Sequence, residues 1–280
     1  MINPKPKISD FKFNIHSQFG EDGIIEKIFK IIGTKSKISV EFGACDGFLL
    51  SNTANLWTKD WQGILIEMDR KLYKSNLDKV KKYNCIFLNK KVTSDGANTI
   101  ENILKKENIN QVDFLSIDID SDDYYIFNSL TWLKPRLISC EFNPTIPAHL
   151  ELLPQKDSFF GCSVLSLVKL AESKGYKLVT TTDTNCFFVR EQDISRFSDF
   201  DTSLESNFIN KRITYLMTGY AGDFVMSRFP TYGFNFPSQQ KFINGDVFQI
   251  RNYFLLKMKN FIKNILPIRI VEFLNKTSKT

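Results

Sequence analysis

Histidine is scarce in this chain, and the cysteines show no metal-binding spacing. Only two histidines occur among the 280 residues, and neither lies at ligand spacing from any of the five cysteines. A zinc site is therefore not expected. The cysteines are scattered without a C-x-x-C pair, and most lie within or beside apolar runs, so we expect reduced and largely buried thiols.

Long apolar runs are also missing. No uninterrupted apolar run reaches the length of about 18 residues that a membrane-spanning helix needs, so none is expected. The first residues, Met1 to Lys7, lack the apolar core of a signal peptide, so we expect a cytoplasmic protein. Hydrophobic residues make up 42% and charged residues 24% of the chain, which is typical of a soluble globular protein.

The net charge of +6 is concentrated at the C-terminal end. Residues 251–280 contain seven lysines or arginines and one acid, so the other 250 residues are neutral overall and indicate no nucleic-acid-binding body. Apolar side chains recur at helical spacing between residues 254 and 266, which predicts a basic amphipathic helix. Such a helix suits peripheral contact with an anionic membrane, packing on the core, or contact with a second subunit in a homo-oligomer.

Short apolar segments alternate with helix-compatible segments from Ser17 onward. This alternation predicts a parallel sheet with helices on both faces. The expected strands are 38–42, 63–67, 85–88, 114–117 and 137–142, and the expected helices are 17–32, 52–58, 70–82, 97–107 and 122–130.

The pattern changes after residue 142. Residues 143–160 resemble a loop insertion, and a helix is predicted from Ser163 to Lys174. Two further strands, 176–182 and 186–190, are joined by a short turn and predict an antiparallel hairpin. We therefore expect a core over residues 1–190, an aromatic accessory region over 191–250 that shapes an acceptor pocket, and the basic tail over 251–280.

The segment from Val40 to Gly47 is the most informative. A strand ends in Glu41 and is followed by Gly43-x-x-x-Gly47. Glycines at these places let the backbone approach a ligand closely. In open α/β sheets, ligands bind outside the carboxyl ends of the strands.

Four segments resemble the class I S-adenosylmethionine-dependent methyltransferases, over about residues 17–190. More narrowly, the chain is similar to FkbM-like O-methyltransferases and to small sugar methyltransferases of bacterial polysaccharide loci. The segments are Ser17-Gln18-Phe19-Gly20-Glu21-Asp22, residues 40–47, Ile64-Leu65-Ile66-Glu67, and Phe114 to Asp120. After the last segment, the Glu-Gly usual in the family is replaced by Ser121-Asp122.

The resemblance implies a Rossmann-like methyltransferase sheet and a set of residues that bind S-adenosylmethionine. Glu41 and the glycine turn would hold the methionyl part, and Glu67 would accept the ribose hydroxyl protons. Met68 would pack on adenine, and Asn89 would read the adenine amino group. For Gln18 and Asp22, helix capping is an equal alternative. The full expected set is Gln18, Asp22, Glu41, Gly43, Ala44, Gly47, Glu67, Met68, Asn89 and Asp118.

Acids follow the strands 114–117 and 137–142, which are expected to be neighbours. Oxygen ligands from Asp118, Glu141 and Asn143 suit a hard divalent ion such as Mg²⁺ or Mn²⁺. Asp120 would share a face with Asp118 if the strand continued. The neighbouring Asp122 and Asp123 are assigned to the amino end of the next helix.

Two residues are candidates for a catalytic base. His149 is favoured by residue type, with an ordinary surface-loop histidine as the alternative, and Asp120 is the other candidate.

The sequence thus predicts an O-methyltransferase that acts on a sugar hydroxyl of a nucleotide-linked or polysaccharide precursor. The sugar and its context come from the resemblance, and N- or C-methylation stays open. One alternative is an NAD-dependent Rossmann oxidoreductase, but the chain lacks Gly-x-Gly-x-x-Gly there and carries the hairpin. Another is a non-enzymatic, membrane-associated binding protein, which leaves Glu41, Glu67 and the Asp118–Asp120 pair unexplained.

Overall fold

A computed structural model describes residues 4–220 and 224–227 of the chain. The chain divides after Ile213 into two units, and each is described by itself. The basic tail predicted at 251–280, and residues 228–250 of the predicted accessory region, lie outside the described residues.

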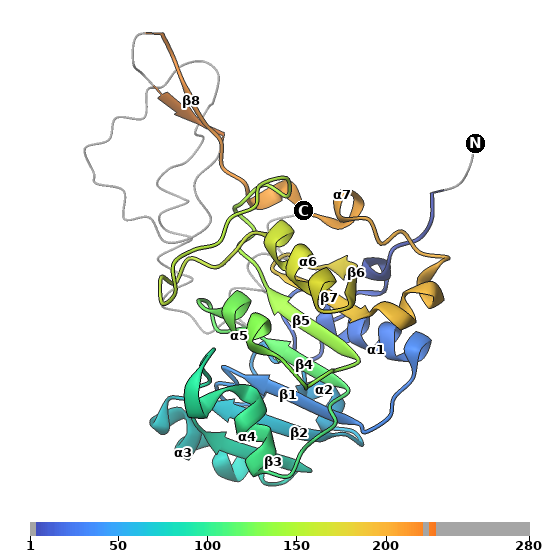
Figure 1. The fold of residues 1–280 in the computed structure, drawn as a ribbon, viewed down its shortest axis with the longest axis vertical. Coiled ribbons are helices and arrows are strands. Elements are labelled where there is room, and N and C mark those ends of the chain that lie inside the picture. The colour runs from blue at the N-terminus through green and yellow to red at the C-terminus, as the bar shows by residue number, and fades with distance from the viewer. Residues whose placement is uncertain (1–3, 221–223, 228–280) are drawn as a thin grey trace, which may run out of the picture. The chain divides into compact units, whose positions relative to one another are not determined.

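The first unit is built on a seven-stranded sheet with the order β3-β2-β1-β4-β5-β7-β6 (Figure 1). The first five strands along the chain run parallel, and β7 pairs antiparallel with both β5 and β6. The predicted parallel sheet and its terminal hairpin are both confirmed. The strands are β1 (Ile38–Phe42), β2 (Gln62–Glu67), β3 (Cys85–Asn89), β4 (Phe114–Ile117), β5 (Leu137–Glu141), β6 (Tyr176–Thr181) and β7 (Asn185–Arg190).

Helices cover both faces of the sheet, because successive strand residues point to opposite sides and both sides are apolar. In β1 and β2, for example, Val40 and Ile64 belong to one apolar cluster and Leu65 to the other. Side chains of α4, α5 and α6 pack in the first cluster, and those of α1, α2 and α3 in the second. The helices are α1 (Glu21–Ile32), α2 (Ala54–Trp57), α3 (Arg70–Val80), α4 (Ile100–Lys106), α5 (Asp123–Ser129), α6 (Val164–Ser173) and α7 (Leu204–Asn207), with 3₁₀ turns at Ile8–Phe11, Gly96–Asn98, Glu191–Phe197 and Asn210–Arg212.

Helix α1 begins four residues later than predicted. The sequence placed its start at Ser17, but the carboxylate of Asp22 accepts the backbone N–H groups of Ile15, His16 and Ser17 at 2.7, 2.8 and 3.0 Å. The hydroxyl of Ser17 in turn accepts the backbone N–H of Asp22 at 3.0 Å. Ser17 therefore does cap the helix, but across a short loop that Asp22 holds in place.

The insertion between β5 and α6 is confirmed and forms a strap, by which we mean residues 143–162. It contains no helix or strand. The hydroxyl of Tyr125 donates to the carbonyl of Pro154 at 2.6 Å, and the amide of Asn143 donates to the carbonyl of Phe160 at 2.7 Å. The first bond fastens the strap to α5. The second joins the two ends of the strap to each other.

The described part of the second unit contains an antiparallel pair of short strands, β8 (Leu216–Thr218) and β9 (Phe224–Met226). Throughout the described ranges, the helices are too short or too polar to cross a bilayer.

Glu101 of α4 is a buried acid with a structural role. Its carboxylate accepts the backbone N–H groups of Thr131, Trp132 and Leu133 at 2.7–2.8 Å and the hydroxyl of Thr131 at 2.7 Å. Burial raises the pKa of Glu101, but these hydrogen bonds outweigh burial and leave its pKa below the ordinary value. The carboxylate thus fixes the turn between α5 and β5.

We predict that Glu101→Gln lowers the free energy of unfolding by about 2 kcal/mol at neutral pH, because one acceptor oxygen and the charge are lost. A lowered folded pKa gives stability above the unfolded pKa of about 4.3, and this stability is lost as the pH falls through the folded value. The difference between variant and wild type should therefore shrink in acid. Urea unfolding at several pH values measures it, with Glu107→Gln beside the same helix as the control. An equal loss at all pH values would contradict the role of the charge.

Candidate functional site

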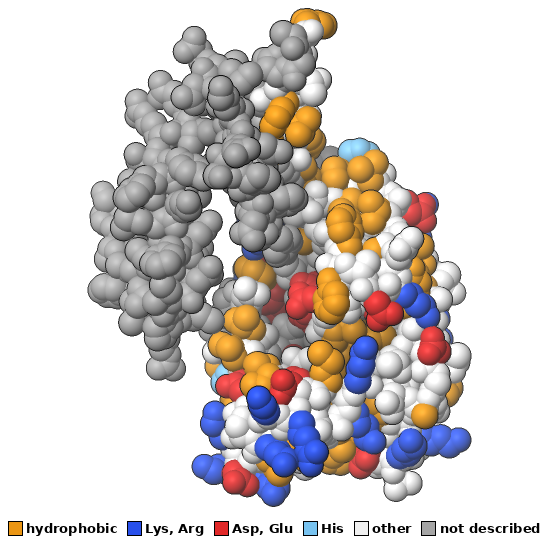
Figure 2. Space-filling view, turned by 90° about the vertical axis from the view of Figure 1, so that its left-hand side faces the viewer, with side chains coloured by type: hydrophobic (Ala, Val, Ile, Leu, Met, Phe, Trp, Pro, Cys, Tyr) orange, Lys and Arg blue, Asp and Glu red, His pale blue; other side chains and the backbone are white. Residues whose placement is uncertain are grey.

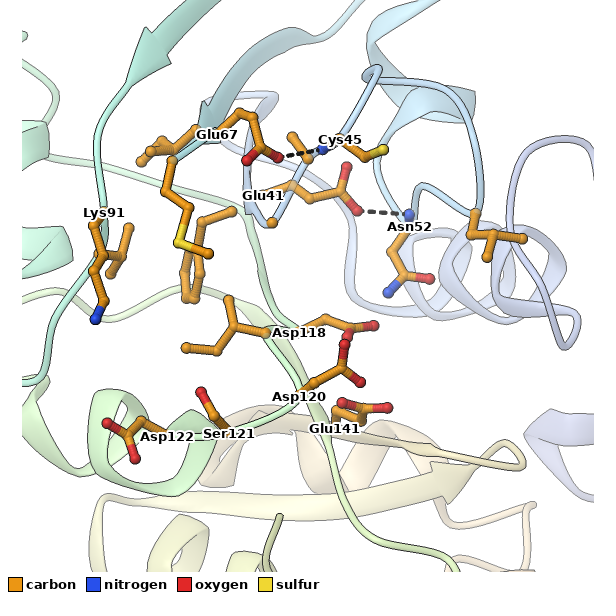
Figure 3. A pocket seen from close by; sticks show the side chains of 18 of the residues that line it. Glu41, Cys45, Asn52, Glu67, Lys91, Asp118, Asp120, Ser121, Asp122 and Glu141 are labelled. Carbon is orange, nitrogen blue, oxygen red and sulfur yellow. Dashed lines mark hydrogen bonds between the residues drawn. The ribbon is translucent and has the colours of Figure 1, made fainter. Parts of the chain in front are cut away.

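A cavity of about 700 Å³ lies at the carboxyl ends of the parallel strands. Its wall is made by the segments that follow β1, β2, β3, β4 and β5, by the strap, and by the turn between β6 and β7 (Figure 3). This is the edge of an open α/β sheet at which ligands bind.

The turn after β1 approaches the end of β4 very closely. Gly43 has a φ of +74°, and a Cβ atom at this position would lie 2.6 Å from the backbone oxygen of Asp118. Only glycine fits there without displacing one of the two segments. Both residues, together with Ala44, line the cavity as predicted.

Gly47 does not line the cavity. It lies beneath the turn, where a Cβ atom would be 3.1 Å from Val80 and 3.3 Å from Leu65. Its predicted place among the cofactor-binding residues is corrected to a packing role under the turn.

Glu67, at the end of β2, is held by two backbone groups. Its Oε2 accepts the N–H of Cys45 at 2.8 Å, and its Oε1 accepts the N–H of Asp69 at 2.7 Å (Figure 3). A carboxylate oxygen can accept two hydrogen bonds, so each oxygen keeps one acceptor site. Glu67 is 6% exposed and lines the cavity, and Met68 beside it is 66% exposed and lines it too. The predicted position of both residues is therefore observed.

Glu41 is occupied by its own chain. Its carboxylate accepts the hydroxyls of Ser51 and Thr53 at 2.5 and 2.7 Å and the backbone N–H of Asn52 at 2.8 Å. Burial raises its pKa in spite of these hydrogen bonds. Glu41 does line the cavity, but its oxygens hold the 51–53 segment instead of projecting free toward a ligand.

Near the start of α1, the residues that line the cavity differ from those predicted from the sequence. Gln18 lines the cavity as expected, whereas Asp22 does not, because its carboxylate is used by the loop before α1. Its neighbour Glu21 lines the cavity instead. The sequence signal for Glu21 was present in the Ser-Gln-Phe-Gly-Glu-Asp segment, but helix capping accounted for it equally well.

Asn89 also falls outside the cavity wall. Its amide donates to the backbone oxygens of Glu67 and Met68 at 2.8 and 3.1 Å and so ties β3 to the end of β2. The following lysines, Lys90 and Lys91, line the cavity in its place. Figure 2 shows lysine and arginine side chains gathered over the lower part of the molecule, where β3 and α3 lie.

Three carboxylates meet at the ends of β4 and β5. One oxygen from each of Asp118, Asp120 and Glu141 lies within 4.8 Å of the other two (Figure 3). Burial, followed by the charge of Asp118, raises the pKa of Glu141 to about 10. Burial, followed by the charges of Asp123 and Asp120, raises the pKa of Asp118 well above its ordinary value. The cluster therefore requires a proton or a cation.

The cluster forms by a turn and not by a continued strand. We expected Asp118 and Asp120 to share a strand face, but β4 ends at Ile117 and Asp120 has a φ of +62°. The buried carboxylate of Asp123 accepts the N–H groups of Ile119 and Ser121 at 2.9 and 3.1 Å and holds this turn. Burial raises the pKa of Asp123 to about 6.

Asp122 lies at the amino end of α5 as predicted, where it is the N-cap residue, and it also contacts the strap. Its Oδ1 accepts the backbone N–H of Asp157 at 2.9 Å and so fastens the strap to the start of α5. Lys156 of the strap also pairs with Asp95 at 3.1 Å. Lys156, Asp157 and the 77% exposed Phe159 all line the cavity.

Asn143 is not part of the acidic cluster, so its predicted role as a metal ligand is corrected. Its Oδ1 accepts the N–H and the hydroxyl of Thr145 at 2.9 and 2.6 Å, and its amide donates to Phe160. These bonds shape the first turn of the strap and leave no free oxygen.

His149 is not brought to the cavity either. Ile146 is buried and anchors the strap, and the N–H of Leu150 donates to the carbonyl of Pro147 at 3.0 Å. This turn leaves His149 exposed and outside the cavity wall. Of the two candidate bases, only Asp120 lies in the site.

The turn between β6 and β7 contributes residues that the sequence analysis missed. Thr184 and Asn185 line the cavity, and Asn185 pairs in register with Glu141 on the adjacent strand. Asn185 is 4% exposed, and its Oδ1 has no hydrogen-bond partner among the described residues. The sequence indicated only a turn at these residues. Their position beside Glu141 follows from the pairing of β7 with β5, which the sequence alone does not specify.

Comparisons with known proteins find similarity in structure only. No protein-family model matches the chain, and no curated protein matches it in sequence. The chain is similar to the CMeT domain of the citrinin polyketide synthase, with 12% identity and a TM-score of 0.42, over 60% of this chain and 50% of that one. It thus spans half the length of that relative.

Two further solved structures are S-adenosylmethionine-dependent methyltransferases. The one from Clostridium acetobutylicum has 11% identity and a TM-score of 0.39, over 61% of this chain and 90% of that one. The one from Aquifex aeolicus has 14% identity and a TM-score of 0.35, over 61% and 89%. The strand order of the sheet, with its terminal hairpin, is the Rossmann-like arrangement that the sequence predicted.

We predict that Gly43→Ala destabilises the protein by about 3 kcal/mol, because a positive φ and a clash with Asp118 both act there. Gly175→Ala is the matched control. Gly175 has a φ of +78° with nothing within 4 Å of the added Cβ, so only the conformational cost of about 1 kcal/mol applies. Urea unfolding of both variants measures the difference. Equal losses would show that the close approach is unimportant.

Proposed function

We propose that the chain is an S-adenosylmethionine-dependent O-methyltransferase acting on a sugar hydroxyl of a nucleotide-linked or polysaccharide precursor. The observation that carries the proposal is Glu67, a buried strand-end carboxylate with free acceptor sites, placed beside the Gly43 turn. A ribose diol needs two such acceptors, and the side-chain-poor turn leaves room for the rest of the nucleoside.

The alternative oxidoreductase is less well supported. A dinucleotide pyrophosphate binds a Gly-x-Gly-x-x-Gly turn at a helix N-terminus, and the turn after β1 carries only two glycines, one of which is buried beneath it. The antiparallel β7 also departs from the all-parallel dinucleotide-binding sheet.

S-adenosylmethionine, when bound, supplies a methyl group on a positively charged sulfur. The chain must hold an acceptor hydroxyl in line with it and remove the hydroxyl proton. Asp120 takes this proton in the metal-free form of the proposal, because its carboxylate is exposed to the cavity beside the strand ends. His149 has no part, since it lies outside the cavity.

The acceptor half of the cavity is rich in hydrogen-bond acceptors. Asp118, Asp120, Glu141 and Asn185 all line it. A sugar offers several hydroxyl donors to such a wall, and the exposed ring of Phe159 gives an apolar surface on which a sugar ring can stack.

A divalent ion completes the proposal. Asp118, Asp120 and Glu141 offer three oxygens within 4.8 Å of one another, and the amide oxygen of Asn185 beside Glu141 has no partner within the described ranges. A hard ion such as Mg²⁺ or Mn²⁺ would relieve the repulsion of these acids, and it would lower the pKa of a bound hydroxyl.

We predict that the wild type binds S-adenosylhomocysteine in calorimetry and that Glu67→Gln weakens binding about tenfold or more, because a charged acceptor of the ribose is lost. Asp69→Asn is the control, since Asp69 only caps α3 through Lys71 and Leu72. Binding of NAD but not of S-adenosylhomocysteine would reject the methyltransferase. Release of S-adenosylhomocysteine with a panel of nucleotide sugars tests the acceptor class.

We predict that Mn²⁺ alone binds the wild-type protein and that Asp120→Asn weakens this binding about tenfold or more, because a charged ligand becomes neutral. Electron paramagnetic resonance of free Mn²⁺ measures it. Asp122→Asn is the control, because the amide oxygen can still accept the Asp157 N–H. Absence of Mn²⁺ binding by the wild type, together with turnover that survives a chelator, would contradict the metal site. The repulsion within the acidic cluster would then be relieved by bound protons.

A further inference from the structure

Glu21 is the first residue of α1, and it is almost completely buried, with 1% exposure. Its Oε2 accepts the backbone N–H of Phe19 at 2.6 Å. Its Oε1 is buried and has no hydrogen-bond partner in the part of the chain that the structure describes. The residue lines the cavity.

A buried carboxylate oxygen without a donor is costly and calls for an explanation. Burial lowers the pKa of Lys12, and the nearby charges of Asp183 and Glu21 partly oppose this shift. Lys12 nevertheless makes no hydrogen bond with the Oε1 of Glu21. Because Glu21 lines a cavity, a molecule that fills the cavity can supply the missing donor. A positively charged donor forms the strongest hydrogen bond with a carboxylate.

The place of Glu21 along the sheet identifies which part of the ligand reaches it. Glu67 and Lys91 mark the β2–β3 end of the cavity. Helix α1 instead packs through Phe29 on Phe114 of β4, with the ring centroids 6.5 Å apart, and Arg136 before β5 donates to the carbonyl of Ile32 at the end of α1, so Glu21 lies away from the β2–β3 end. A molecule whose adenosine is held at Glu67 therefore extends its other end toward α1.

We propose that the Oε1 of Glu21 accepts a hydrogen bond from the α-ammonium group of S-adenosylmethionine and thereby fixes the amino-acid end of the cofactor. This inference rests on the proposed function. Glu21 thus takes the role that the sequence assigned to Glu41, whose oxygens already accept hydrogen bonds from Ser51, Asn52 and Thr53. The neighbouring Asp22 also has a buried oxygen without a partner among the described residues, but Asp22 does not line the cavity.

The test compares two ligands by calorimetry. S-adenosylhomocysteine carries the ammonium group, whereas 5′-methylthioadenosine contains the adenosine and sulfur but no amino-acid end. Glu21→Gln keeps the shape and can still accept the Phe19 N–H, but it removes the charge. We expect it to weaken S-adenosylhomocysteine about tenfold or more and to leave 5′-methylthioadenosine within about twofold.

The matched control is Glu26→Gln on the same helix, because Glu26 pairs with Lys30 and Lys59 away from the cavity. We expect this variant to bind both ligands as the wild type does. Equal weakening of both ligands by Glu21→Gln, or no weakening of S-adenosylhomocysteine, would overturn the inference. A wild type that binds neither ligand would instead reject the proposed function itself.

A second measurement does not depend on how the variant folds. The wild-type protein is titrated with N-acetyl-S-adenosylhomocysteine, which lacks the charged ammonium group. We expect about tenfold or greater loss of affinity relative to S-adenosylhomocysteine. Equal affinities would show that no group in the cavity recognises the ammonium, and the inference would then be wrong.

Discussion

The close approach of Gly43 to the backbone oxygen of Asp118 is the constraint on which the cavity depends. Parallel strands bring their carboxyl ends to one edge, but they do not by themselves leave space there. The absence of a side chain at Gly43 lets the turn after β1 rest on the end of β4. The backbone N–H of Cys45 then reaches Glu67 of β2. One glycine thus couples three strand ends into a single wall.

The acids of the cavity divide into two kinds. Those whose oxygens are satisfied within the chain build the wall, as Glu41 does for the 51–53 segment and Asp123 for the turn after β4. Those that keep unsatisfied or mutually repelling oxygens, such as Glu21, Asp118 and Glu141, are stable only with a partner that carries positive charge or protons. This distinction depends on hydrogen bonds, so residue type alone does not reveal it.

Much of the fold followed from the sequence, because buried parallel strands are short apolar runs and the terminal hairpin has a turn of its own. The edge of the sheet was therefore predicted, together with Gly43, Glu67 and Asp118. The details failed where a side chain had a local alternative. Asn143 and Asp22 were each expected to bind a ligand, but nearby backbone N–H groups already donate to the Oδ1 of Asn143 and to the Oδ2 of Asp22. Asn185 was missed because only the pairing of β7 with β5 places it beside Glu141.

The strap follows β5 and leads into α6, and it contributes Lys156, Asp157 and Phe159 to the wall of the cavity. The strap contains no strand, and of its residues only Ala148 and Cys162 pack in an apolar cluster of the described chain. Substitutions at residues 153–160 can accordingly reshape this part of the wall while the strand ends at Gly43 and Glu67 stay in place. The strap thus lets one side of the cavity vary independently of the sheet.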